Sequence, residues 1–175
     1  GAIVLQARFF SEIIRRLPDN TVTLEVIENN QVAITSGKAN FTVNGLDADS
    51  YPHLPVVESQ DRIEVPAHIL NKIVNETVFA VSQHESRPIL TGVHFVLENK
   101  KLLAVATDSH RLSQRVIPLE SGEANFNIVI PGKSLTELSR SLTDEEEAIQ
   151  ISIMDNQVLF QTNTMKFYSR LLEGT

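Results

Sequence analysis

Residues 107–111, Thr-Asp-Ser-His-Arg, contain the serine, histidine and carboxylate of a serine hydrolase. A catalytic triad needs these side chains to converge, whereas neighbouring residues of an extended chain point in opposite directions. Ser109 also lacks the flanking glycines of a nucleophile elbow, so we do not expect a hydrolase. Alternation would instead place Thr107, Ser109 and Arg111 on one side of the chain, where Leu90 and Leu112 could wall a groove. In the simpler interpretation, the histidine and arginine of this run only cap a strand turn.

Metal and thiol chemistry have little support in the sequence. The five histidines, at positions 53, 68, 84, 94 and 110, do not show metal-ligand spacing, and the chain has no cysteine. The absence of cysteine suits a reducing compartment, and no stretch approaches the roughly 20 apolar residues of a membrane span. The N-terminus also lacks the basic and apolar regions of a signal peptide. We therefore expect a cytoplasmic protein with no catalytic residue, metal or cofactor and no membrane partner.

The charge of the chain is unevenly distributed. Its 175 residues include 15 lysines and arginines against 22 acidic residues, and a net charge of −7 argues against a protein whose whole surface coats nucleic acid. Basic residues outnumber acidic ones on three segments of helical character. Charge alone favours ordinary solvated helix faces, but the same distribution would suit weak, sequence-independent attraction to phosphates. These segments carry Arg8, Arg15 and Arg16 against Glu12, His68 and Lys72 against Glu76, and Lys133 and Arg140 against Glu137.

A repeated unit organises the chain. Residues 3–17, 63–78 and 128–142 share a short apolar strand, a small residue and a helix. Spacing of three between apolar residues predicts one buried face on each helix. The positions that coincide without gaps are Ile3, Ile63 and Ile128, then Ala7, Ala67 and Gly132, then Phe10, Leu70 and Leu135, then Ile13, Ile73 and Leu138.

Three strands are predicted after each helix, the first two joined by a tight polar turn. Alternating apolar residues, such as Val22, Leu24 and Val26 in one repeat, predict that one face of each strand contacts a core. The predicted strands are 21–27, 31–35 and 39–46, then 92–97, 102–107 and 111–119, then 149–154, 157–162 and 165–172.

The repeats predict an α+β protein with an unusual domain count. Residues 47–61, with Pro52 and Pro55, have the composition of an extended connection. If two repeats form one compact domain, the chain holds one and a half domains. That count, together with Gly1 in place of methionine, predicts a fragment of a longer chain.

Several motifs resemble those of one family. They are AVATDSHRL at 104–112, RPILTGVHF at 87–95, SRLLEG at 169–174, VIPGK at 129–133 and SYPHLP at 50–55. These motifs are similar to those of the bacterial sliding clamp, the β subunit of DNA polymerase III, in the family's order and over the whole chain. The resemblance implies the DNA clamp fold, in which antiparallel sheets lie outside and helices line a channel around duplex DNA.

The resemblance also implies a domain assignment. Residues 1–56 would be the second half of the first clamp domain, 57–61 a linker, and 62–175 nearly all of the middle domain, with the third domain absent. The full-length chain would form a homodimeric ring. The strand around Phe41 and Val43 would form the dimer edge, and in a fragment this apolar edge would favour self-association.

Two further surfaces follow from the resemblance. One is the surface that faces DNA, and the other is a pocket that takes a short motif with apolar and aromatic anchors from partner proteins. Many clamps have glycine at the position of Ser109, which bears on the detailed shape of the pocket. The DNA-facing candidates are Arg8, Arg15, Lys72, Gln83, His84, Arg87, Lys133 and Arg140. The pocket candidates are Leu90, Thr107, Ser109, His110, Arg111 and Leu112.

The expected function is processivity. The ring would tether the replicative polymerase and dock its catalytic subunit, the clamp loader and other proteins with the same motif. DNA-directed DNA polymerase activity, a nucleotidyltransferase reaction, would belong to the holoenzyme and not to this chain. The alternative is a peptide-binding adaptor that never encircles DNA. An enzyme acting on DNA ends would need convergent acids, whereas the acidic run at 144–147 is sequential and typical of a solvated turn.

Overall fold

The computed structural model describes residues 1–54, 61–120, 123–143 and 147–174. The chain divides into two compact units, Gly1–Val56 (unit 1) and Val57–Thr175 (unit 2). All of the linker expected at 57–61 except Asp61, and all of the acidic run at 144–147 except Glu147, lie outside the described residues.

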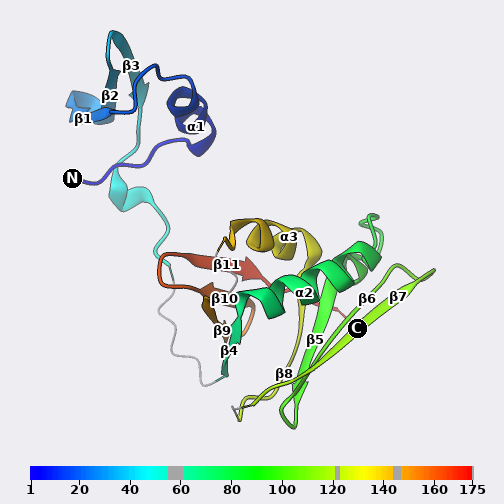
Figure 1. Cartoon of the computed structure of the whole chain (residues 1–175). Helices are drawn as coiled ribbons and strands as arrows, with labels where there is room; N and C mark the ends of the chain where they lie inside the picture. The colour runs from blue at the N-terminus through cyan, green and yellow to red at the C-terminus, as the bar shows by residue number, and fades with distance from the viewer. Residues whose placement is uncertain (55–60, 121–122, 144–146, 175) are drawn as a thin grey trace. The chain divides into compact units, whose positions relative to one another are not determined.

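The three predicted helices begin at the small residues that aligned in the sequence. They are α1 at Ala7–Arg15, α2 at Ala67–Thr77 and α3 at Gly132–Ser141 (Figure 1). Pro66 and Pro131 are the N-caps of α2 and α3 and adopt extended backbone angles. Proline suits a helix start, because a missing N–H costs nothing where no helical acceptor is available.

Unit 1 contains α1 and a three-stranded antiparallel sheet of order β1-β2-β3. Asn29 and Asn30 make the predicted turn between β1 and β2 with φ of 58° and 55°, which asparagine tolerates better than most residues. Val32 and Ile34 of the central strand are buried. The elements are β1 Thr23–Ile27, η1 Glu28–Asn30, β2 Gln31–Ser36, β3 Ala39–Asn44 and η2 Ala48–Ser50.

The burial predicted for unit 1 is wrong in part. Leu24 and Val26 alternate as expected, but each is 52% exposed and β1 has no buried residue. Phe10 and Ile13 of α1 are only half-buried. The physical reason is that β1 is an edge strand whose apolar face is not covered within the described residues.

Unit 2 contains two complete repeats and two four-stranded antiparallel sheets, of order β11-β10-β9-β4 and β7-β6-β5-β8. Helices α2 and α3 contact each other and pack on the sheets (Figure 1). The first repeat comprises β4 Arg62–Pro66, α2, η3 Val78–Ala80, η4 Pro88–Thr91, β5 Gly92–Glu98, β6 Lys101–Thr107 and β7 Leu112–Pro118. The second comprises β8 Phe126–Pro131, α3, β9 Ala148–Ile153, β10 Gln157–Gln161 and β11 Lys166–Arg170.

The two repeats of unit 2 exchange their first strands. Strand β4 of the first repeat pairs with β9 of the second, where Ile63 lies opposite Ile151. Strand β8 of the second repeat pairs with β5 of the first, where Ile128 lies opposite Phe95. Each four-stranded sheet therefore needs both repeats.

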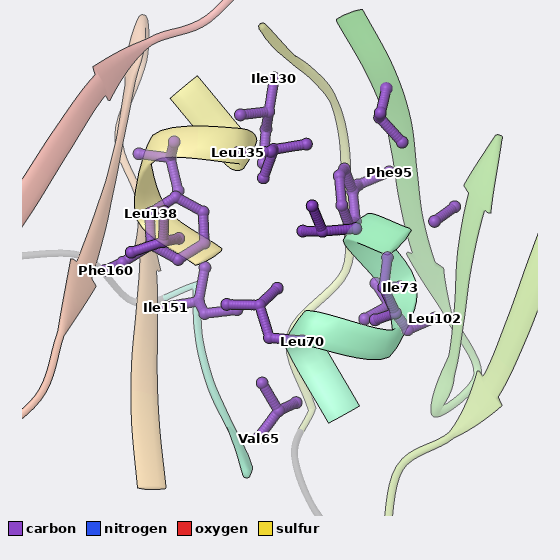
Figure 2. Close-up of a cluster of buried hydrophobic side chains, with 14 of the residues drawn as sticks. Val65, Leu70, Ile73, Phe95, Leu102, Ile130, Leu135, Leu138, Ile151 and Phe160 are labelled. Atoms are coloured by element: carbon purple, nitrogen blue, oxygen red, sulfur yellow. The ribbon is translucent and has the colours of Figure 1, made fainter. Parts of the chain in front are cut away.

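One core joins the elements of unit 2. In Figure 2, side chains from both helices and both sheets point toward a common centre. Burial of each large apolar side chain stabilises the fold by about 1.5–3 kcal/mol. The core includes Leu70 and Ile73 of α2, Leu135 and Leu138 of α3, Phe95 of β5, Leu102 of β6, Ile151 of β9 and Phe160 of β10.

Candidate functional site

A tight turn connects β6 to β7 and contains most of the predicted pocket residues. The backbone N–H of Ser109 donates to Thr107 Oγ1 at 3.2 Å, and that hydroxyl donates to the carbonyl of Arg111 at 2.7 Å. The expectation of an extended chain with alternating side chains is therefore wrong at this place. The chain reverses direction because polar side chains satisfy the backbone groups of the turn.

Asp108 is the main acceptor in this turn. Its Oδ1 accepts from the backbone N–H groups of His110 and Arg111, both at 3.0 Å. Its Oδ2 accepts from Arg111 Nε, also at 3.0 Å. These bonds hold the pKa of the Asp108 carboxyl below its usual value, and the largest contribution comes from the backbone N–H of His110. The group is therefore ionised at neutral pH. The carboxylate is thus engaged in shaping the turn.

Ser109 lies in the left-handed region with a φ of 75°. A side chain with a Cβ is disfavoured there, whereas glycine is not. The turn thus holds Ser109 in a conformation that glycine adopts more easily, and the hydrogen bonds of Thr107 and Asp108 offset the cost.

Arg111 connects the turn to the segment after α2. Its Nη2 donates to the carbonyl of Phe79 in η3 at 2.7 Å, and its guanidinium lies 5.6 Å from the centroid of the Phe79 ring. Phe79 is 57% exposed and Leu112, at the start of β7, is 63% exposed. An exposed apolar and cationic surface of this kind suits a partner with apolar or aromatic anchors.

Leu90 belongs to a different segment from the turn. It lies half-buried in η4, where its carbonyl accepts from Ser82 N at 2.8 Å and its N–H donates to the Arg87 carbonyl at 3.0 Å. The structure therefore gathers Thr107, Ser109, His110, Arg111 and Leu112 at the turn between β6 and β7 and places Leu90 in η4.

Three of the predicted DNA-facing residues line one groove of about 480 Å³ between α3 and the loop after η3. Lys133 and Arg140 are two turns apart on α3, and Gln83 lies in the loop. Glu85 and Glu137 also line this groove, and Glu137 Oε1 is 3.1 Å from Arg140 Nη1. The groove therefore combines two exposed cations with two carboxylates that offset their charge.

The other DNA-facing candidates are also exposed, but on separate elements. Lys72 lies on α2, and His84 and Arg87 lie in the loop between η3 and η4. Arg8 and Arg15 belong to α1 of unit 1, where Arg8 Nε is 3.6 Å from Glu12 Oε1. Such exposed ion pairs contribute little to stability and leave the arginines available to a phosphate.

Phe41 and Val43 lie on β3, which is an edge strand of the described sheet of unit 1. Phe41 is exposed, whereas Val43 is half-buried and lines a groove of about 280 Å³ with Phe9, Phe10 and Ile13 of α1. An edge strand beside an apolar groove is a favourable place for another strand to pair.

Phe79 and Asp108 are not among the functional residues expected from the sequence. Asp108 has a local signal, because an aspartate that accepts from a backbone N–H two residues later is typical of an Asx turn. Phe79 has none, since its contact with Arg111 joins residues 32 apart in the chain.

Two general features of the described part of the chain bear on its class. Within it, no helix is long and apolar enough to cross a membrane. The same residues contain no cluster of three or more histidine and acidic side chains suited to a metal ion.

Exchanged first strands, two antiparallel sheets and two helices packed on them define a repeat-built α+β protein of the clamp class. The model for the N-terminal domain of the DNA polymerase III beta subunit matches residues 1–55, and the model for its central domain matches residues 64–175. The chain therefore belongs to the DNA polymerase III beta subunit family, which confirms the predicted resemblance and the predicted fold.

The relatives agree with this family. The chain is 53% identical over 175 residues to the beta sliding clamp of Bacillus subtilis (strain 168), covering 99% of this chain and 46% of that protein. It is 47% identical to the beta sliding clamp of Streptococcus pneumoniae (strain R6), with the same coverage. The chain spans about half the length of these curated relatives.

Solved structures show the same architecture. A crystal structure of the DNA polymerase sliding clamp from Bacillus subtilis matches with a TM-score of 0.93 and 53% identity, covering 100% of this chain and 46% of that one. The DNA polymerase III subunit beta from Pseudomonas aeruginosa still gives a TM-score of 0.90 at 25% identity, covering 100% of this chain and 48% of that one. The arrangement of repeats is thus retained where the sequence has diverged.

Proposed function

We propose that this chain is part of a DNA sliding clamp, which encircles duplex DNA and so confers processivity on the replicative DNA polymerase. The observation that carries the proposal is that the whole chain matches a solved DNA polymerase sliding clamp with a TM-score of 0.93. In this proposal residues 1–56 are the second half of the first domain, 57–61 a linker and 62–175 most of the middle domain. The chain catalyses no reaction and acts in the cytoplasm.

The surface that faces DNA would be formed by the helices and the loop before η4. Its support is the exposure of Lys72, Lys133 and Arg140 and the groove that two of them share with Gln83. Phosphates attract such cations without regard to base sequence, and attraction of this kind weakens as salt competes. A ring that slides needs contacts of this weak type.

The partner-binding surface would be formed by the turn between β6 and β7 together with Leu90 of η4. Exposed Leu112 and the Phe79–Arg111 pair support this assignment, because apolar and aromatic anchors need such a surface. The proposed partners are the polymerase catalytic subunit, the clamp loader and other proteins that carry the same motif.

Topological retention tests the proposed function. The full-length protein is loaded on nicked circular DNA by the clamp loader, and retention is measured before and after linearisation. A ring stays on the circle at high salt and slides off the linear product. Equal retention on both, or none on either, would instead favour an adaptor that does not encircle DNA.

A matched pair of variants tests the proposed dimer edge. Phe41→Asp places a charge on the apolar face of β3, so we expect monomeric full-length protein and loss of retention on circles. Thr42→Asp, on the opposite face of the same strand, is the control and should remain dimeric. Sedimentation velocity measures both, and a dimeric Phe41→Asp variant would contradict the edge assignment.

A further inference from the structure

The Arg111 side chain is held from two sides. Its Nε donates to Asp108 Oδ2 at 3.0 Å, within the turn itself. Its Nη2 donates to the Phe79 carbonyl at 2.7 Å, and the Phe79 ring lies against the guanidinium. A guanidinium has more N–H groups than these two bonds use, and the side chain is largely exposed. Arg111 can therefore be fixed in place and still donate to an incoming chain.

Asp108 has two separable contacts. Oδ1 accepts from two backbone N–H groups and so shapes the turn, whereas Oδ2 accepts from the arginine. An asparagine at this position could keep the first contact through its carbonyl oxygen. Its amide N–H₂ would then face Arg111 Nε, and two donors cannot bond to each other. One substitution can thus release the guanidinium while the turn remains.

We propose that Asp108 and Phe79 are positioning residues for the partner-binding surface, which fix Arg111 before a partner peptide arrives. This inference rests on the proposed function, because it concerns the surface assigned there to partner docking. The fixed guanidinium and the exposed ring of Phe79 form one platform beside Leu112. The platform suits a peptide that offers an apolar or aromatic anchor together with a carbonyl or carboxylate acceptor.

Preorganisation gives the expected magnitude. A long side chain that is free before binding must be ordered during binding, and that ordering lowers the affinity by about three- to tenfold. Asp108→Asn in the full-length protein should therefore weaken peptide binding within this range. Phe79→Leu should also weaken it, because the leucine keeps the backbone acceptor but removes the aromatic ring.

The experiment measures peptide binding by fluorescence anisotropy. The probe is a fluorescein-labelled peptide with the apolar and aromatic anchors of the polymerase catalytic subunit from the organism that makes this protein. Asp155→Asn is the matched control, because Asp155 is an exposed aspartate in the turn between β9 and β10, outside the proposed surface. It should bind the peptide as the parent protein does. Thermal unfolding should show the same midpoint for all three variants to within a few degrees.

Two readouts separate positioning from a merely structural role. Solvent exchange of the Arg111 Nε–H, measured by ¹⁵N NMR, should accelerate in Asp108→Asn and not in Asp155→Asn. In a double-mutant cycle, Asp108→Asn should have no added effect on peptide affinity once Arg111→Gln is present.

Unchanged peptide affinity in both Asp108→Asn and Phe79→Leu would overturn the inference while leaving the proposed function intact. Additive effects with Arg111→Gln would overturn it as well, because the residues would then act independently. If the parent protein itself fails to bind the peptide, the docking part of the proposed function is wrong, and the positioning role falls with it.

Discussion

Unit 1 and the second repeat of unit 2 have the same local structure but different burial. In unit 1, Val4 and Leu46 form an antiparallel bridge, and Gly45 N donates to the Asn30 carbonyl at 2.7 Å. In the second repeat, Leu172 N donates to the Val129 carbonyl at 2.9 Å, and Leu171 N donates to the Asn156 carbonyl at 2.9 Å. These bonds join corresponding positions of the repeat, so the two segments have the same backbone structure.

The burial of corresponding side chains is not the same. Leu24 pairs with Ile34 in unit 1 as Ile151 pairs with Phe160 in the second repeat, yet Leu24 is 52% exposed and Ile151 only 5%. The difference arises because residues of α2, α3 and both sheets cover the face that carries Ile151, whereas no described element buries the apolar face of β1. A repeat of this kind specifies its own backbone, but its core comes from the repeat with which it exchanges strands.

Substitution of a charged residue at these two corresponding positions should give the largest difference in stability between the units. Ile151→Asp buries an unpaired carboxylate in the core of unit 2, and we expect a loss of about 4 kcal/mol or more in its free energy of unfolding. Leu24→Asp leaves the charge in water and should change the stability of the 175-residue chain by less than about 0.5 kcal/mol. Urea unfolding followed by circular dichroism measures both.

Hydrogen exchange provides the control for that comparison. Amides of β9 and β10 should lose protection in Ile151→Asp, while amides of β2 in unit 1 keep theirs. A Leu24→Asp variant that unfolds unit 1 would show that β1 is covered in solution, as it would be by self-association of the chain.

Truncation of corresponding helix residues should give a smaller contrast. Leu135 of α3 is fully buried, and Leu135→Ala should cost about 3–4 kcal/mol, because it removes contacts and leaves a cavity. Phe10 of α1 is only half-buried, so Phe10→Ala should cost about 1 kcal/mol despite the larger side chain removed. Hydrogen exchange in β10 and β2 reports the two units separately. Equal losses would mean that the α1 face is covered in solution.

Much of the fold could be predicted from the sequence because its signals are local. The small residues Ala7, Ala67 and Gly132 mark the helix starts, and the polar turns mark the hairpins. The burial of unit 1 could not be predicted in this way, since alternation in β1 shows which face is apolar and not whether another element covers it.

In the candidate site, too, local features could be predicted from the sequence and contacts between distant residues could not. The residues of the turn between β6 and β7 are contiguous, so one motif identified them together. Alternation of side chains predicts an extended geometry for them, but it does not reveal the side-chain hydrogen bonds of Thr107 and Asp108 that turn the chain. Phe79 was missed because only the folded chain brings it to Arg111.

The hairpin turns should give the smallest difference in stability between the units. Asn99 and Lys100 form a two-residue turn between β5 and β6 with φ of 53° and 60°, and Asn30 has a φ of 55° in the corresponding turn of unit 1. Lysine is disfavoured in this left-handed region, whereas asparagine tolerates it and glycine suits it best. Lys100→Gly should therefore stabilise unit 2 by about 0.5 kcal/mol, the relief of backbone strain exceeding the entropy that glycine adds to the unfolded chain.

Asn30→Gly should be neutral or slightly destabilising in unit 1, because the strain it would relieve is already small. For unit 2, the Lys100→Gly gain corresponds to a rise of about 1–2 °C in the thermal midpoint, which differential scanning calorimetry resolves. A fall in that midpoint would mean that the lysine side chain makes a favourable contact whose loss exceeds the backbone strain. The hairpin turns of the two units would then differ in their side-chain contacts, as the strands differ in burial.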